Sequence, residues 1–228
     1  MRIGVVVFPG TNCDSDTLDA LKTLDVEGLR IDYREHRLPA VDKVIVPGGF
    51  SYGDYLRSGA LAAQMPVMDA VADAVSADGL PVLGICNGFQ ILCERGLLPG
   101  ALRPNISGQF ISAWQPMRLT FVPPALKGLQ SGEVLSLPIA HHEGCYTLPA
   151  HELRGLFEKG RVLAQYSHED GQVDALSNPN GSIANIAGIW QDSVIGLMPH
   201  PERAMAAFLG SRDGRRFLSS WLGKEGPS

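Results

Sequence analysis

Short apolar runs recur through the first half of the chain and predict buried strands. Residues 3–7 and 44–46 are continuous β-branched or apolar stretches, and residues 82–85 form another run behind a proline. A further strand is expected at residues 29–33. Runs of this kind, rather than an alternation of apolar and polar residues, are typical of strands covered on both faces.

Helical patterns fill the intervals between these strands. The segment at residues 14–24 starts with Asp and Ser, which cap helices, and residues 59–77 carry an apolar stripe on one helical face. We expect the second helix to continue through Pro66. Strands that alternate with helices predict an α/β fold with a mostly parallel sheet and helices on both faces.

The second half is richer in turn signals and strands. Strands are expected at residues 117–122, 134–140, 162–166, 183–190 and 194–198. Helices are expected at residues 152–159 and from Arg203 to about Leu209, with residues 217–222 closing the fold. We interpret residues 1–222 as a single domain and residues 223–228 as a frayed tail.

Composition and charge exclude several classes of function. The 228 residues are 45% apolar and carry a net charge of −5, with no basic run, which argues against nucleic-acid binding. No apolar stretch approaches the ~18 residues of a membrane helix. The four cysteines include no C-x-x-C pair, so we expect free thiols, a cytoplasmic protein and no metal site. Asn105 and Asn180 lie in Asn-x-Ser glycosylation sequons, which we regard as coincidental in a cytoplasmic protein.

Cys86 stands where a nucleophile is expected. It follows the strand at residues 82–85, precedes a helical pattern, and has Gly84 and Gly88 two residues away on either side. Gly-x-Cys-x-Gly is the thiol form of the nucleophile elbow, a sharp turn from strand to helix that tolerates no bulky neighbours. A helix N-terminus and a nearby imidazole both favour the thiolate.

His200 is the best candidate for that imidazole. It follows the apolar strand at residues 194–198, which places it at a strand's carboxyl end, where α/β sheets bind ligands. Pro199 and Pro201 stiffen its backbone, and Glu202 is close enough to orient the ring. We therefore interpret Cys86 as the nucleophile, His200 as the base and Glu202 as the group that orients the base.

The glycines after the third strand are candidates for an oxyanion hole. Gly48 and Gly49 follow residues 44–46 directly, and backbone N–H groups in such a loop can face a developing negative charge. A second donor is the N–H of Asn87, which follows the nucleophile. The loop matches neither the dinucleotide-binding nor the phosphate-binding glycine motif, so no nucleotide is expected on this chain.

These motifs together resemble class I (triad) glutamine amidotransferases. Gly-Ile-Cys-Asn-Gly-Phe-Gln at residues 84–90 and Pro-His-Pro-Glu at residues 199–202 are similar to that class, whose fold is a flavodoxin-like open sheet. Pro-Gly-Gly-Phe-Ser-Tyr-Gly-Asp at residues 47–54 narrows the resemblance to the glutaminase subunits of phosphoribosylformylglycinamidine synthases. The joint order of the motifs is specific and covers nearly the whole chain.

The resemblance implies a reaction. Cys86 attacks the side-chain amide of glutamine, and the N–H groups of Gly49 and Asn87 hold the tetrahedral intermediate. His200, oriented by Glu202, passes a proton to the leaving ammonia and then activates water against the γ-glutamyl thioester. The ammonia reaches a large synthetase subunit, which uses it in purine biosynthesis.

The same resemblance implies partners and substrate contacts. Gly48, Gly49 and Gln90 are expected to contact glutamine. A small third subunit is expected to complete the complex with the large synthetase subunit. ATP and magnesium belong to that synthetase, so no cofactor is expected on this chain.

The chain departs from the family at one loop, and alternatives stay open. His142 stands where the family usually has glycine in Ala-His-Gly-Glu-Gly; if that position has a positive φ, His142 is strained. We read His141, His142 and Glu143 as a polar loop without a catalytic or metal role. Alternatives to the glutaminase are a flavodoxin-like cysteine hydrolase or glyoxalase-like protein, and an interaction subunit without chemistry.

Overall fold

The computed structural model describes residues 1–224 and divides the chain into two compact units. Unit 1 contains Met1–Pro99 and Gln191–Leu197, and unit 2 contains Gly100–Trp190 and the chain from Met198 onward. The expected single domain over residues 1–222 stays a prediction, and residues 225–228 of the expected tail lie outside the described residues. Within residues 1–224, no helix has the length and apolarity needed to cross a membrane.

Unit 1 is a parallel α/β layer. Its elements are β1 (Arg2–Val7), α1 (Asp14–Thr23), β2 (Glu27–Asp32), β3 (Lys43–Val46), α2 (Pro66–Asp78), β4 (Val82–Ile85), α3 (Asn87–Glu94) and β11 (Val194–Leu197). The strands lie in the order β2-β1-β3-β4-β11, and every pair is parallel. The expected α/β class with a mostly parallel sheet is confirmed.

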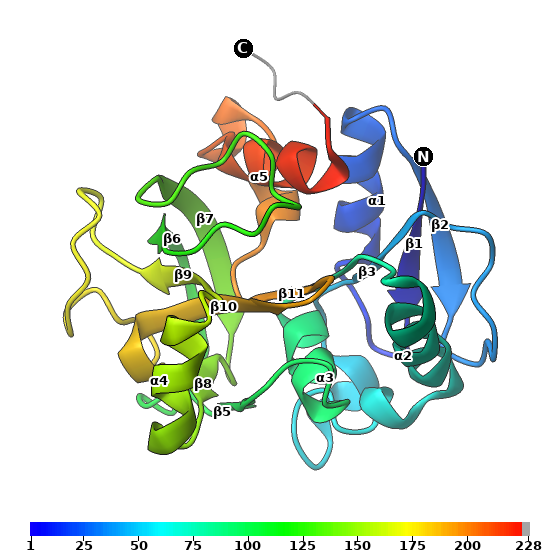
Figure 1. The fold of residues 1–228 in the computed structure, drawn as a ribbon, viewed down its shortest axis with the longest axis horizontal. Coiled ribbons are helices and arrows are strands. Elements are labelled where there is room, and N and C mark those ends of the chain that lie inside the picture. Colours follow the sequence, from blue (N-terminus) through cyan, green and yellow to red (C-terminus); the bar gives the residue numbers. More distant parts are fainter. Residues whose placement is uncertain (225–228) are drawn as a thin grey trace. The chain divides into compact units, whose positions relative to one another are not determined.

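The strand order explains why helices cover both faces of this sheet. The chain moves from β1 to β2 in one direction and from β3 to β4 in the other, so right-handed crossovers put α1 and α2 on opposite faces. Figure 1 shows α1 on one side of the strands and α3 on the other. The direction of winding reverses at β1 and β3, and ligands bind at the carboxyl ends of strands around such a point.

The expected helix over residues 59–77 is wrong in its first part. A short 3₁₀ turn at Ala62–Gln64 is followed by Met65 in an extended conformation, and α2 begins only at Pro66. Proline suits the first position of a helix, because its missing N–H has no partner there, but it disfavours a helical residue before it. Pro66 therefore starts the helix instead of lying inside it.

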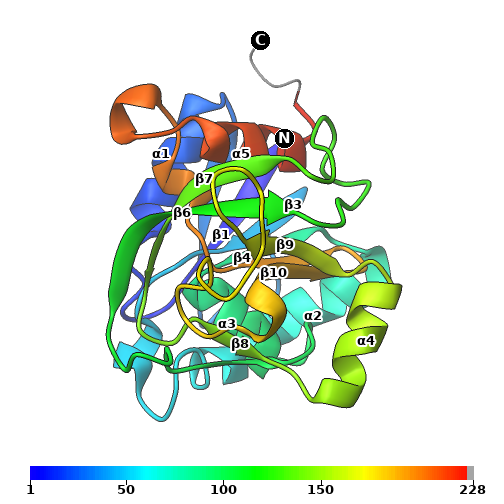
Figure 2. The same cartoon turned by 90° about the vertical axis from the view of Figure 1, so that its left-hand side faces the viewer.

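Unit 2 is built from antiparallel strands. Its elements are β5 (Ala101–Arg103), β6 (Ile111–Leu119), β7 (Val134–His141), β8 (Cys145–Thr147), α4 (Ala150–Glu158), β9 (Val162–Tyr166), β10 (Ile186–Gln191) and α5 (Asp213–Leu222). Strands β10, β9, β6 and β7 are neighbours in that order, and β5 pairs with β8. Helix α5 packs along β7 (Figure 2).

The strand expected at residues 117–122 is β6, which spans Ile111–Leu119, and two further elements expected in unit 2 are wrong. The predicted strand at residues 183–190 starts only at Ile186, because Ala184 and Asn185 have left-handed backbones with φ of 49° and 57°. The predicted helix from Arg203 to Leu209 is two short 3₁₀ turns, Pro201–Arg203 and Ala207–Leu209. The intervening Ala206 is extended, which prevents a continuous helix.

Candidate active site

Cys86 occupies the strained turn that the sequence pattern predicts. It lies between β4 and α3 with φ of 50° and ψ of −106°, a conformation that side chains rarely adopt. Strain of this kind persists where the surrounding structure holds it, and it is common at functional sites. The residue is 5% exposed and directly precedes the first turn of α3, where the helix dipole favours an anion.

Both elbow glycines are required by close packing. A Cβ atom on Gly88 would collide with the backbone carbonyl oxygen of Val46 in β3, and one on Gly84 would lie 2.8 Å from the backbone of Gly88. Real Cβ atoms do not approach backbone atoms this closely, so a side chain at either position would push α3 away from the sheet. The Gly-x-Cys-x-Gly spacing thus has a steric cause.

The loop after β3 lies against the loop after β1. Gly49 has φ of 144° and forms an isolated bridge with Thr11, and the Cys13 N–H donates to the carbonyl of Gly48 at 3.3 Å. A Cβ on Gly49 would lie 2.8 Å from the backbone nitrogen of Asn12. This position therefore tolerates only glycine.

Asn87 and Gln90 connect the elbow helix to that loop. The buried Asn87 side chain donates to Oε1 of Gln90 at 2.8 Å, and its Oδ1 accepts the N–H of Ser51 at 3.3 Å. Ser51 belongs to the segment that follows Gly48 and Gly49. The expected oxyanion-hole residues are Gly49, in the loop after β3, and Asn87, at the start of α3. The hydrogen bond from Ser51 to Asn87 joins these two segments. The expected contact between Gln90 and glutamine stays a prediction.

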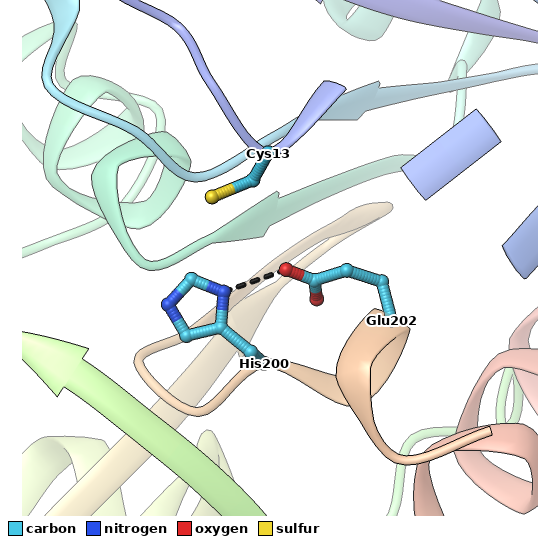
Figure 3. Close-up of side chains that lie close together, drawn as sticks. All are labelled: Cys13, His200 and Glu202. Carbon is cyan, nitrogen blue, oxygen red and sulfur yellow. Dashed lines mark hydrogen bonds and ion pairs between the residues drawn. The ribbon is translucent and has the colours of Figure 1, made fainter. Parts of the chain in front are cut away.

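His200 and Glu202 form a buried pair in unit 2. His200 Nδ1 lies 2.6 Å from Oε1 of Glu202, and the two side chains are 2% and 0% exposed (Figure 3). Because the carboxylate can only accept, Nδ1 carries the hydrogen and Nε2 is the basic nitrogen. The sequence prediction that Glu202 orients the His200 ring is consistent with this bond.

Two neighbouring elements fix the backbone of this pair. The His200 N–H donates to the carbonyl of Pro138 in β7 at 2.8 Å. A Cβ on Gly214, in the first turn of α5, would collide with the carbonyl of Pro201, so the helix packs directly on the His200–Glu202 turn. Neither support could be predicted from local sequence patterns, because both come from distant parts of the chain.

Three other polar residues near the predicted motifs have defined surroundings in the structure. Arg57 forms a two-bond ion pair with Glu94 at 2.6 Å. His142 is exposed and has no positive φ, so replacing the family's glycine causes no strain there. His141, expected in a polar loop, is instead the buried last residue of β7.

Two of the other cysteines are less acidic than a free thiol. Burial raises the pKa of the Cys93 thiol far above its usual range, and burial also raises the pKa of Cys145. Cys93 is a buried residue of α3, and its thiol donates to the carbonyl of Pro99. All four cysteines are free, as expected from the sequence.

Comparisons with known proteins place the chain in a family. A family described as the CobB/CobQ-like glutamine amidotransferase domain matches residues 1–222. Phosphoribosylformylglycinamidine synthase subunit PurQ of Aquifex aeolicus is 48% identical over 226 residues, covering 97% of this chain and 99% of that protein. PurQ of Thermomicrobium roseum is 50% identical over 226 residues, covering 97% and 95%.

The chain belongs to the PurQ family of glutamine amidotransferases. The structure of PurLQS from Thermotoga maritima contains a chain that superimposes on it with a TM-score of 0.83 at 38% identity, covering 97% of each. The class I glutamine amidotransferase fold and the family resemblance expected from the motifs are therefore confirmed. Membership of the PurQ family decides against the cysteine hydrolase or glyoxalase-like alternative.

Proposed function

We propose that this chain hydrolyses glutamine to glutamate and ammonia with Cys86 as nucleophile, His200 as base and acid, and Glu202 as the group that orients His200. One observation supports the proposal above all. The chain contains both a strained cysteine, Cys86, directly before a helix and a buried His200–Glu202 pair joined by a hydrogen bond. Nucleophile, base and orienting group of this kind are the parts that acyl transfer from an amide needs.

The covalent chain supports the assignment of His200 to Cys86. Strands β4 and β11 are parallel neighbours with Ile85 opposite Leu197, and the Cys86 N–H donates to the Leu197 carbonyl at 2.7 Å. His200 is the third residue after Leu197. Three residues span at most about 11 Å even when fully extended, so the backbone of His200 stays tethered to the elbow.

The chemistry proceeds in two stages. Nε2 of His200 takes the proton of the Cys86 thiol, the resulting thiolate adds to the amide carbon of glutamine, and the carbonyl π electrons move to oxygen. The carbon–nitrogen bond then breaks, the nitrogen takes a proton from Nε2 of His200, and ammonia leaves a γ-glutamyl thioester. Water next loses a proton to His200 and attacks the thioester, which releases glutamate and returns the thiol.

We assign the stabilisation of the oxyanion to the N–H groups of Gly49 and Asn87. The glycine-only backbone at Gly49 and the bond between Asn87 and Gln90 support this assignment, because both keep the donors fixed before substrate arrives. Donors that need no rearrangement stabilise the intermediate most effectively. Gly48, Gly49 and Gln90 are our candidates for contacts with glutamine.

We propose that the ammonia is delivered to a separate synthetase. The relatives named above are subunits of phosphoribosylformylglycinamidine synthase, and the similar solved structure is named PurLQS. By this likeness, the partners are a large synthetase subunit, which carries ATP and magnesium and makes formylglycinamidine ribonucleotide, and a small third subunit. No cofactor is assigned to this chain. We place the reaction in the cytoplasm, where reducing conditions preserve a catalytic thiol.

The test is glutamine hydrolysis by Cys86→Ala, measured with and without the synthetase partner. We expect weak hydrolysis by the wild-type chain alone, faster hydrolysis in the complex, and none by the variant in either case. Synthesis driven by added ammonia should stay intact in the Cys86→Ala complex, because that step does not use the thiol. Cys93→Ala, on the same helix, is the matched control and should retain hydrolysis. If Cys86→Ala hydrolysed glutamine at the wild-type rate, the assignment of Cys86 as the nucleophile would be wrong.

A further inference from the structure

The loop after β3 is bonded along one of its edges to the loop after β1. The Phe50 N–H donates to the carbonyl of Gly10 at 3.1 Å, and the Tyr52 N–H donates to the carbonyl of Pro9 at 2.7 Å. These bonds use every second residue, as they do along the edge of a β-strand. The N–H of Ser51, the residue between them, is therefore left for the opposite edge of the loop.

The Asn87 side chain lies on that opposite edge. Its Oδ1 accepts the Ser51 N–H at 3.3 Å, and its Nδ2 donates to Oε1 of Gln90 at 2.8 Å. A backbone N–H can only donate, so the Asn87 amide has one possible orientation. The three residues are at most 5% exposed, and a buried donor that loses its acceptor is costly. Asn87 is thus a fixed link between the loop and α3.

Asn87 is connected to both N–H groups that we assign to the oxyanion hole. Its own N–H lies in the first turn of α3, where backbone N–H groups have no acceptor within the helix. Its side chain holds Ser51, two residues after Gly49. The bonds from this segment to the loop after β1 are made by Gly48 and Phe50, the neighbours of Gly49, and do not use its own N–H. The spacing of the two donors therefore depends on the bond between Asn87 and Ser51.

We propose that the Asn87 side chain is a positioning group, which sets the spacing of the Gly49 and Asn87 N–H groups and keeps the oxyanion hole assembled before glutamine binds. This inference rests on the proposed glutaminase function and deepens it. In this role the side chain acts through the two N–H groups and contacts no reacting atom. Its effect is confined to steps in which the substrate oxygen gains charge, because the two donors stabilise that charge.

Asn87→Leu separates this role from general support of the elbow. Leucine is similar in size to asparagine but cannot accept the Ser51 N–H. In the complex with the synthetase, kcat for glutamine should fall by about 10–100-fold, as for a group misplaced by about 1 Å, and KM should change by less than about twofold. Alkylation of Cys86 by iodoacetamide forms no oxyanion, so its rate on the same complex should stay within about twofold of wild type.

Two further variants sharpen the test. Cys93→Ala alters a buried residue of the same helix without touching this bond, and it should keep both rates. In Asn87→Asp a carboxylate oxygen can still accept the Ser51 N–H, and Gln90 can turn its amide to donate to the other oxygen. We expect kcat, measured at the pH optimum of each variant, to be at least about fivefold higher in Asn87→Asp than in Asn87→Leu. Equal values would overturn the proposal, because the acceptor would then not matter.

The other patterns also overturn it. Parallel losses of hydrolysis and alkylation would mean that Asn87 supports the Cys86 turn itself. A loss mainly through KM would mean that it acts on binding through Gln90, and no loss would mean that the bond has no role. Should Asn87→Leu fail to fold, Asn87→Ala removes the same acceptor with less bulk, and the same pattern is expected. Failure of the glutaminase assignment is distinguishable, because Cys86→Ala would then retain hydrolysis whatever the Asn87 variants do.

Discussion

Nδ1 of His200 lies 2.6 Å from Oε1 of Glu202, and this pair forms within a single short turn. Pro201 separates the two residues and restricts the backbone between them. The acceptor and the ring come from the same turn, and β7 and α5 hold the backbone of that turn. The proposed base is therefore preorganised before glutamine binds.

Replacing Glu202 with Gln should impair catalysis without damaging the fold. An amide at this position can donate to Nδ1 of His200 and so favour the tautomer in which Nε2 carries the hydrogen and is not basic. The analogous change in a Ser–His–Asp triad costs about 10⁴ in kcat, and we expect a loss on the order of 10²–10⁴ here. The measurement is glutamine hydrolysis in the complex, with the exposed Glu152→Gln as control. A rate close to wild type would remove Glu202 from the triad.

Alkylation by an electrophile that mimics glutamine should label Cys86 before any other cysteine. Cys93 and Cys145 have raised pKa values caused by burial, so little of either is thiolate at neutral pH. Mass spectrometry of the intact complex after a short exposure gives the order of labelling. Excess glutamine should protect Cys86 alone. Early labelling of Cys13, Cys93 or Cys145 would contradict the site.

Gly88→Ala should disable the elbow through sterics alone. The added Cβ meets the backbone carbonyl of Val46, which cannot rotate away, so α3 and the Cys86 turn must shift. We expect a stability loss of about 1–3 kcal/mol and loss of glutamine hydrolysis. Gly155→Ala in α4 is the matched control, because its Cβ meets nothing within 4 Å. Unfolding in denaturant and hydrolysis measured on both variants check the prediction; active Gly88→Ala would show that the elbow tolerates a side chain.

Local patterns were sufficient to predict the first strands of unit 1 and the elbow. Continuous apolar runs identify β1, β3 and β4, because both faces of those strands are covered and no polar residue interrupts them. The elbow is readable because its turn needs glycines at a fixed spacing from Cys86. The second helix was predicted to start too early, because the residues before Pro66 have the apolar pattern of a helix. A proline disfavours a helical conformation in the residue that precedes it, so the helix starts at Pro66.

Long-range contacts account for what the sequence did not predict. Ala184 and Asn185 lie in an apolar stretch that suggests a strand, yet the Asn185 side chain donates to the carbonyls of Tyr166 and Asp174 and stabilises a turn. His141 lies beside charged residues that suggest an exposed loop, but the alternation of β7 continues one residue further and buries it. The hydrogen-bond partner of His141, Asn105, is distant in the sequence. Its local sequence shows only a glycosylation sequon and does not indicate this contact.

The buried neutral state of His141 should make stability depend on pH. Its pKa is about 4 in the folded chain against an ordinary 6.5, so the unfolded chain binds the extra proton first as pH falls. The stability contributed by the neutral imidazole is thus fully present above pH 6.5 and decreases between pH 6.5 and 4. By pH 5 the loss should approach about 2 kcal/mol. Denaturant unfolding at pH 7 and pH 5 should show this loss in the wild type and in His142→Leu, and a smaller one in His141→Leu; equal losses in all three would show that His141 titrates normally in the fold.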